Sequence, residues 1–337
     1  MRADTLRPVT ADRLDRSAVD PGAARWLAPA TAALAVAVGA VAVLGPLATG
    51  AITYRVTPLL EHQLEGADLV SLLLVVPSLL LAAALLLRRS PAGPLLALGS
   101  ATAAWYLAAE LVLGPDRTGT PGNDEAYLPL FLTVLLVSSA VALGSWWAVR
   151  PSAAALEERT RRVLGPLLLL VVAAFLLGRY LPAWWSIVSG HPSEEYLAGP
   201  QVWWTVAFED LVLLLPAAAA TGVGLLRRAR WSGPAAFAVS GCLALVGAAV
   251  VAMAWSNTVH GDPGSTVGTA LTMTGIGVVT VLPAVLCWAG FLRTGRRAAP
   301  PRHGGDGVVA LAALGALGAL GGGPAPRRAD DRSGSRS

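Results

Sequence analysis

The chain has 337 residues, of which 55% are hydrophobic and 14% charged, and its formal net charge is +4. Its mean hydropathy is +0.61. A soluble core of ordinary size does not hide that much apolar surface, so the composition predicts an integral membrane protein.

All 25 basic residues are arginines, because the sequence contains no lysine. This excludes a Walker A loop, a Schiff base to retinal or pyridoxal phosphate, and a lysine general base. The HExxH, GxSxG and paired CxxC patterns are also missing from the sequence. We therefore expect no cofactor. We also expect no nucleic-acid partner, because the arginines are distributed as membrane topology requires.

Eight apolar stretches are each long enough, at roughly 20 residues, to cross about 30 Å of hydrocarbon as an α-helix. In chain order they cover residues 27–50, 69–87, 94–113, 127–149, 163–181, 203–226, 234–255 and 267–292. The sequence therefore predicts an all-α, polytopic transmembrane helix bundle with eight spans, numbered here 1 to 8. Its expected surroundings are a lipid bilayer, and its oligomeric state is left open.

The arginines predict how these spans are oriented, since basic residues that flank a span stay on the cytoplasmic side. With both termini inside, 22 of the 25 arginines lie in the cytoplasm, and only Arg55, Arg117 and Arg179 lie outside. Shifting the map by one helix would place about half of these charges on the wrong face. We therefore predict a multi-pass protein of the cell membrane with both termini cytoplasmic.

Spans 2 and 6 share a pattern. In each, an acid (Asp68, Asp210) begins an apolar run, a proline (Pro77, Pro216) interrupts it, and a pair of arginines ends it 11 residues after the proline. We interpret this as an internal duplication. Since both spans run in the same direction, the predicted halves are two parallel four-helix repeats.

The predicted organisation has five parts: a cytoplasmic tail (1–26), repeat 1 (27–149), a cytoplasmic linker (150–162), repeat 2 (163–292) and a low-complexity cytoplasmic tail (293–337). The apolar part of the last segment has glycines at short intervals. Because glycine disfavours a stable helix, we do not expect a ninth span.

Four acids begin or enter apolar runs near the predicted outer surface: Asp68, Glu110, Glu209 and Asp210. Ionisable groups within a membrane are costly and usually face a cavity or a partner. The only basic residues expected nearby are Arg55 and Arg179. We predict that these acids face the bundle interior, either as a substrate, cation or proton site or as ion pairs between the repeats.

Pro77 and Pro216 are expected to kink their helices and free backbone carbonyls beside the acids, which suits a cation or proton site. A weaker candidate precedes span 2, where Glu61, His62 and Glu65 are spaced to share neighbouring helical turns. Carboxylate oxygens and an imidazole at this spacing suit a metal or acid/base site. The alternative is a solvated loop with acids near a helix N-terminus.

Two groups of residues carry a resemblance to a known family. They are Tyr54-Arg55 with Gly66-x-Asp68-Leu69-Val70, Pro77 and Arg89, and Asp210-Leu211-x-Leu213-x-Leu215-Pro216 with Gly222 and Arg227-Arg228. The chain resembles a family of prokaryotic polytopic membrane proteins, and its Ala, Arg and Gly usage is typical of an actinobacterial source. The resemblance implies an eight-helix integral membrane protein and brings no established activity with it.

Three functions remain open from the sequence. The first is a small permease or ion- or proton-coupled transporter that uses Asp68 and Asp210 as paired ligands. The second is an accessory or partner-binding membrane protein without its own chemistry. The third is a membrane-embedded enzyme using Glu61, His62 and Glu65. A transporter should have a water-accessible path past both aspartates, whereas an enzyme should gather its polar groups in one pocket.

Overall fold

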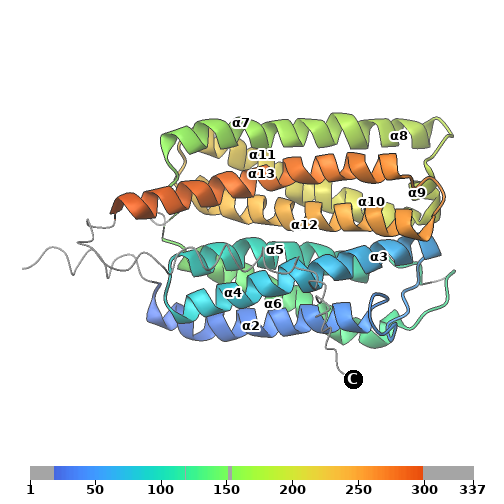
Figure 1. Ribbon diagram of the computed structural model, residues 1–337, viewed down its shortest axis with the longest axis horizontal. Coiled ribbons are helices and arrows are strands. Elements are labelled where there is room, and N and C mark those ends of the chain that lie inside the picture. Colours follow the sequence, from blue (N-terminus) through green and yellow to red (C-terminus); the bar gives the residue numbers. More distant parts are fainter. Residues whose placement is uncertain (1–18, 118, 151–153, 299–337) are drawn as a thin grey trace, which may run out of the picture. The chain divides into compact units, whose positions relative to one another are not determined.

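The structure is a computed structural model that describes residues 19–298, except residue 118 and residues 151–153 (Figure 1). The described residues form helices and no strand, and eight of the helices are long and apolar enough to cross a membrane. The predicted all-α polytopic bundle is therefore confirmed. The tails from residue 1 to 18 and from 299 onward lie outside the described residues.

The eight spans occupy consecutive parts of the chain, and three of them are interrupted helices. The uninterrupted spans 1, 3, 4, 7 and 8 are α2 (Pro21–Leu44), α5 (Ala92–Leu113), α6 (Leu128–Ala148), α12 (Ser232–His260) and α13 (Val267–Ala298). Span 2 consists of α3 (Pro58–Val70), η1 (Ser71–Val75) and α4 (Val76–Leu87), and span 5 of α7 (Glu158–Phe175), η3 (Leu176–Tyr180) and α8 (Leu181–Val188). Span 6 consists of α10 (Pro200–Phe208), η4 (Glu209–Leu214) and α11 (Leu215–Leu226). Two short helices, η2 (Asp124–Tyr127) and α9 (Glu194–Ala198), lie in connecting segments. The chain divides into one compact unit, Met1–Thr294, and a second, Gly295–Ser337, of which only the end of α13 is described.

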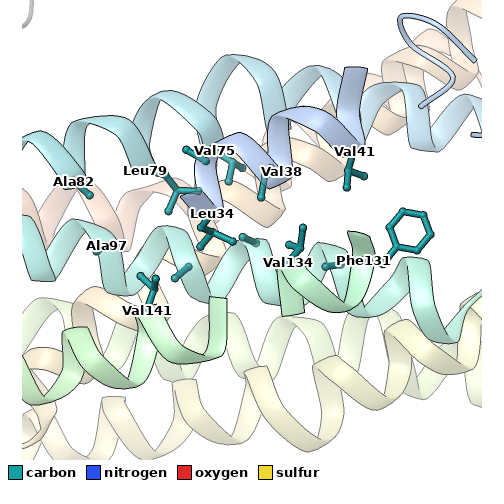
Figure 2. Packing of buried hydrophobic residues seen from close by; sticks show 14 of the residues in the cluster. Leu34, Val38, Val41, Val75, Leu79, Ala82, Ala97, Phe131, Val134 and Val141 are labelled. Atoms are coloured by element: carbon teal, nitrogen blue, oxygen red, sulfur yellow. The ribbon is translucent and has the colours of Figure 1, made fainter. Parts of the chain in front are cut away.

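Spans 1 to 4 form one group of packed helices, in which α2 packs against α4 and α6, and α5 packs against α4 and α6. Figure 2 shows Leu34 of α2 and Leu79 of α4 lying close together in its core. Both side chains are fully buried. Lipid tails are as apolar as leucine, so membrane helices associate mainly through close van der Waals packing. The dense packing of this cluster therefore holds the four helices together.

Spans 5 to 8 pack in the same cyclic order. Helix α7 contacts α11, and α11 contacts α12. Gly277 of α13 faces Val251 of α12, and Gly290 of α13 faces Thr160 near the start of α7. This shared order favours the predicted duplication, which stays a prediction. The two groups meet where α12 packs against α3 and α5, and where α10 packs against α5.

A π-helical turn lies just before a proline in spans 2, 5 and 6. Pro77, Pro182 and Pro216 each stand second in the α-helix that follows η1, η3 and η4. A proline has no N–H to donate, and its ring clashes with the carbonyl four residues earlier. A wider turn at that point accommodates the ring and re-satisfies the backbone. The distortions predicted at Pro77 and Pro216 thus take the form of π turns, and span 5 contains a third.

The polar segment before span 2 is a helix rather than a loop, and Glu61 lies in its first turn. It forms α3, which packs along α12. Gly66 allows this approach, because a Cβ at its position would lie 2.5 Å from the backbone nitrogen of Met253. Span 2 therefore extends over Pro58–Leu87.

Helix α7 begins at Glu158, inside the segment predicted as a linker. The Glu158 carboxylate accepts from Arg161 at 2.6 Å and from Arg162 at 2.8 Å, which are the spacings that support a helix. Its Oε1 also lies 2.9 Å from the guanidinium of Arg228, which follows α11. These charged contacts explain why the helix starts earlier than hydropathy alone predicts.

The connections between spans fall at two ends of the helices. One end, which we call the arginine-rich face, holds the start of α2 and the end of α4 (Figure 1). The arginines described there are Arg25, Arg88, Arg89, Arg150, Arg159, Arg161, Arg162, Arg227, Arg228, Arg230 and Arg293. The opposite end, which we call the acidic face, holds Arg55, Arg117 and Arg179. The positive-inside rule assigns the arginine-rich face to the cytoplasm, and this assignment stays a prediction.

Candidate functional site

A buried carboxyl group, Asp210, is held between two tyrosines from different spans. The hydroxyl of Tyr106 on α5 donates to its Oδ1 at 2.9 Å, and the hydroxyl of Tyr180 on η3 donates to its Oδ2. All three residues are buried. Because a buried carboxylate is costly unless it is hydrogen-bonded, the two donors explain how Asp210 is tolerated inside the bundle. The contact with Tyr106 also joins spans 1–4 to spans 5–8.

The neighbouring acid, Glu209, has no such support. Its side chain is 0% exposed, and in the part of the chain that the structure describes neither carboxyl oxygen has a hydrogen-bond partner. Its charged neighbours are Glu110 of α5 and Asp210, both of them acids. An unsatisfied polar group in a buried position costs about 1–3 kcal/mol, so it calls for an explanation beyond packing.

Asp68 lies apart from Asp210, at the end of α3. It is 7% exposed, and its carboxyl packs against Gly45. Its Oδ2 has no hydrogen-bond partner within residues 19–298 as far as they are described. Together with Ser71 and Glu110, it lines a cavity of about 40 Å³ whose other walls are apolar side chains of α2, α3, α5 and α6. Since one water needs roughly 10–15 Å³ of such volume and two to four polar partners, the cavity suits a few waters rather than a large solute.

Glu110 is half-buried and connects the two regions. It lines the Asp68 cavity and also a second cavity of about 40 Å³ lined by Tyr54 and Gln63. It is in addition an electrostatic neighbour of Asp210. Glu110 therefore neighbours both aspartates, and the predicted pairing of Asp68 with Asp210 stays a prediction.

Tyr54 precedes α3, on the acidic face. Burial, followed by the charges of Asp68 and Asp124, raises the pKa of its hydroxyl well above the usual value. The hydroxyl therefore keeps its proton at physiological pH. It also has no hydrogen-bond partner in the described structure.

The two arginines predicted to neutralise the acids pair elsewhere. Arg55 contacts Asp124 and Glu125, each at 3.3 Å, and Arg179 contacts Glu195 at 3.3 Å. Within the described residues no arginine forms an ion pair with any of the four predicted acids, so the expected ion pairs between the repeats are not formed. Two of these partners, Glu125 and Glu195, are more than half exposed and bind an arginine at a low desolvation cost, whereas the third, Asp124, is buried beside Arg55. Arg179 acts on Asp210 and Glu110 only over a longer distance.

Counted from the proline of each span, Asp68 and Asp210 do not occupy the same position. Asp210 lies six residues before Pro216, and the residue six before Pro77 is Ser71. Asp68 belongs to an α-helical turn, whereas Asp210 belongs to the π turn η4. The two aspartates therefore occupy different helical positions, although the sequence around them looks alike.

The metal candidates before span 2 contact α12 rather than one another. His62 pairs with Asp262, and Glu65 pairs with His260. The side chain of Glu61 has no hydrogen-bond or ion-pair partner among the described residues. In the part of the chain that the structure describes, no three histidine, cysteine or acidic side chains are grouped as metal ligands.

Sequence reasoning missed Tyr106 and Tyr180 as parts of the site. A signal was present, because both lie inside predicted spans and a phenol in hydrocarbon needs a hydrogen-bond partner. It also missed Asp262 as the partner of His62, which lies 200 positions away in the sequence.

The chain was compared with known proteins at three levels. No protein-family model matches the chain, and neither a curated protein nor a solved structure matches it significantly.

Proposed function

We propose that the protein is a small ion-coupled transporter whose ion-binding group is the acid cluster of Glu110, Glu209 and Asp210. The observation that carries this proposal is the fully buried carboxyl group of Glu209, which has no hydrogen-bond partner among the described residues. A carboxyl group kept only for structure would be expected to have donors, as Asp210 has. One that binds and releases a proton or cation needs free oxygens instead.

The position of the cluster supports the same proposal. Glu110 and Tyr106 belong to α5, and Glu209 and Asp210 to η4, so the acids lie where the two groups of four helices meet. Many transporters place their ion site at the interface between repeats, where interrupted helices supply the ligands. The π turn η4 is such an interruption, and it contains both acids.

The chemistry of the cluster follows from its neighbours. Tyr106 and Tyr180 fix the carboxyl group of Asp210, so Asp210 is the oriented member. Glu209 is the free member, and binding a proton or a cation removes the cost of its buried charge. A bound proton or cation lowers the free energy of the cluster, so binding shifts the equilibrium between different packings of α5 against the span 6 helix.

The test is ion flux in liposomes that contain the purified full-length protein. We expect wild-type protein to move protons, Na⁺ or K⁺ down an imposed gradient, and Glu209→Gln to lower the flux roughly tenfold or more, because the amide cannot bind the ion. Glu125→Gln is the matched control, since Glu125 pairs with Arg55 and its side chain is 55% exposed.

Two results would contradict the proposal. Wild-type protein that moves none of these ions would favour an accessory membrane protein without its own chemistry. A Glu209→Gln variant with unchanged flux and a shifted melting temperature would make Glu209 a structural residue.

A further inference from the structure

We infer that the coupled ion is the proton, and that it is taken up at the acidic face by a chain of imidazole and carboxyl groups leading to Asp68. This inference rests on the proposed function, because it names the ion that the acid cluster binds. The members of the chain are Asp262, His62, His260 and Glu65, and we call them the imidazole–carboxyl chain.

The chain is built where α3 packs against α12. The rings of His62 on α3 and His260 on α12 are stacked, with centroids 3.8 Å apart and planes 7° from parallel. His62 Nδ1 lies 2.8 Å from Asp262 Oδ2, and His260 Nε2 lies 3.4 Å from Glu65 Oε2. The side chains of His62 and His260 are 23% and 36% exposed, so both reach the surroundings of the acidic face.

The hydrogen bonds of His260 determine where a proton can reside. Its Nδ1 lies 3.0 Å from the carbonyl oxygen of Ser256, and because a carbonyl only accepts, Nδ1 is the donor. In the neutral ring Nε2 then carries a lone pair, which would face the lone pairs of an ionised Glu65. One proton between Nε2 and Oε2 removes this repulsion, whether it resides on the ring or on the carboxyl group.

His62 is arranged in the corresponding way on the outer side of the stack. The Asp262 carboxylate accepts from Nδ1, which leaves Nε2 free to take up a further proton. The N–H bonds lie in the ring planes, so the stacked rings do not donate to each other. A water at this partly exposed surface carries the proton from His62 Nε2 to the pair formed by His260 and Glu65. No bond between heavy atoms changes in any of these transfers.

The way inward from Glu65 runs along α3. Asp68 follows Glu65 by three residues, so the two carboxyl groups lie on one face of the helix, and each feels the other's charge. No described residue forms a hydrogen bond with Asp68 Oδ2. It lines the same cavity as Ser71 and Glu110, and a few waters there would connect it to Glu110. Glu110 in turn neighbours Glu209 and Asp210.

The chemistry of the chain favours the proton over an alkali cation. Hard cations bind to several oxygen ligands at once and make little use of imidazole nitrogen. Imidazole, by contrast, binds and releases protons near neutral pH. A path whose outer half consists of two stacked imidazoles therefore selects the proton.

The test uses full-length protein in liposomes with a pH-sensitive dye inside and a K⁺ diffusion potential as driving force. We expect Glu65→Gln to slow proton uptake roughly tenfold or more, since a proton-transfer group typically contributes at least that much. Glu65→Asp keeps a carboxyl group and should restore part of the rate. Glu61→Gln is the matched control, because it removes the same charge from the same helix and should stay within about twofold of wild type.

The outcomes separate this inference from the proposed function. Equal proton uptake by wild type and Glu65→Gln would overturn the chain, while a loss in Glu209→Gln would still uphold the transporter. Wild-type flux of Na⁺ or K⁺ without protons would overturn the proton assignment. Wild-type protein that moves no ion would overturn both.

Discussion

Arg89 and Arg228 end α4 and α11 in the same left-handed conformation, with φ of 53° and 59°. The hydrogen bonds around them also agree. Ser90 N donates to Leu85 O, and Ala229 N donates to Gly224 O, each spanning five residues. Together with the shorter bonds made by the two arginine N–H groups, this is the Schellman motif. Its left-handed position is usually glycine, so both spans carry the same unusual cap.

The first prediction follows from this cap. Replacing Arg89 by glycine removes the cost of a left-handed side-chain residue and should raise the free energy of unfolding by about 1 kcal/mol. Arg88 is the control, because its φ of −79° suits any residue. Arg88→Gly should lower stability by roughly 0.5 kcal/mol. Thermal unfolding in detergent measures both, and the opposite ranking would show that the guanidinium of Arg89 matters more than its backbone.

The second prediction concerns the contact of α3 with α12. Gly66→Ala adds a Cβ within 2.5 Å of the Met253 nitrogen. Because that atom is backbone and cannot turn aside, the substitution should destabilise the protein by about 1–3 kcal/mol. Gly275→Ala in α13 is the control, since its Cβ meets open space. If both variants melt together with wild type, the close packing of α3 on α12 is wrong.

The third prediction tests how Asp210 is held. Tyr180→Phe removes one of its two donors and should cost about 1–3 kcal/mol of stability, because the buried carboxyl group loses a hydrogen bond. Tyr106→Phe should act similarly, and the double variant should cost less than the sum, as expected for residues that share one partner. Tyr196→Phe, which removes a hydroxyl outside this cluster, should change the melting temperature little.

The fourth prediction concerns orientation. Reporter fusions after Arg89, Arg162 and Arg230 should be cytoplasmic, and fusions after Thr120, Glu195 and Asp262 should be external, since arginines flanking spans are retained inside. A reporter that is active only in the cytoplasm, combined with one active only outside, provides the measurement. A reversed pattern would move the imidazole–carboxyl chain to the cytoplasmic side.

The spans were predictable because a membrane helix is specified by local composition. Residues 94–113 were expected as a span, and α5 covers Ala92–Leu113. The predictions failed where a helix end depends on partners. Helix α3 is polar enough to resemble a loop, and only the contact of Gly66 with the α12 backbone explains why it is helical and packed.

The acid site was predictable in its membership but not in its geometry. Acids inside apolar runs are costly, so Glu209 and Asp210 stood out, and both are buried. Their partners depend on which spans pack together, and no local pattern specifies that α5 brings Tyr106 to Asp210. The similar runs around Asp68 and Asp210 suggested equivalent positions. Asp68 lies nine residues before its proline and Asp210 six, and this difference of three residues decides the helical face.

The π turns have a mechanical consequence for spans 2 and 6. An extra residue in a turn rotates everything after it by about 100° relative to an uninterrupted α-helix. The segments α3 and α10, toward the acidic face, can therefore present one side to the neighbouring helices while α4 and α11, toward the arginine-rich face, present another. The rotation of α3 and α10 about the helix axis is therefore set independently of the rotation of α4 and α11, which end in the arginine caps.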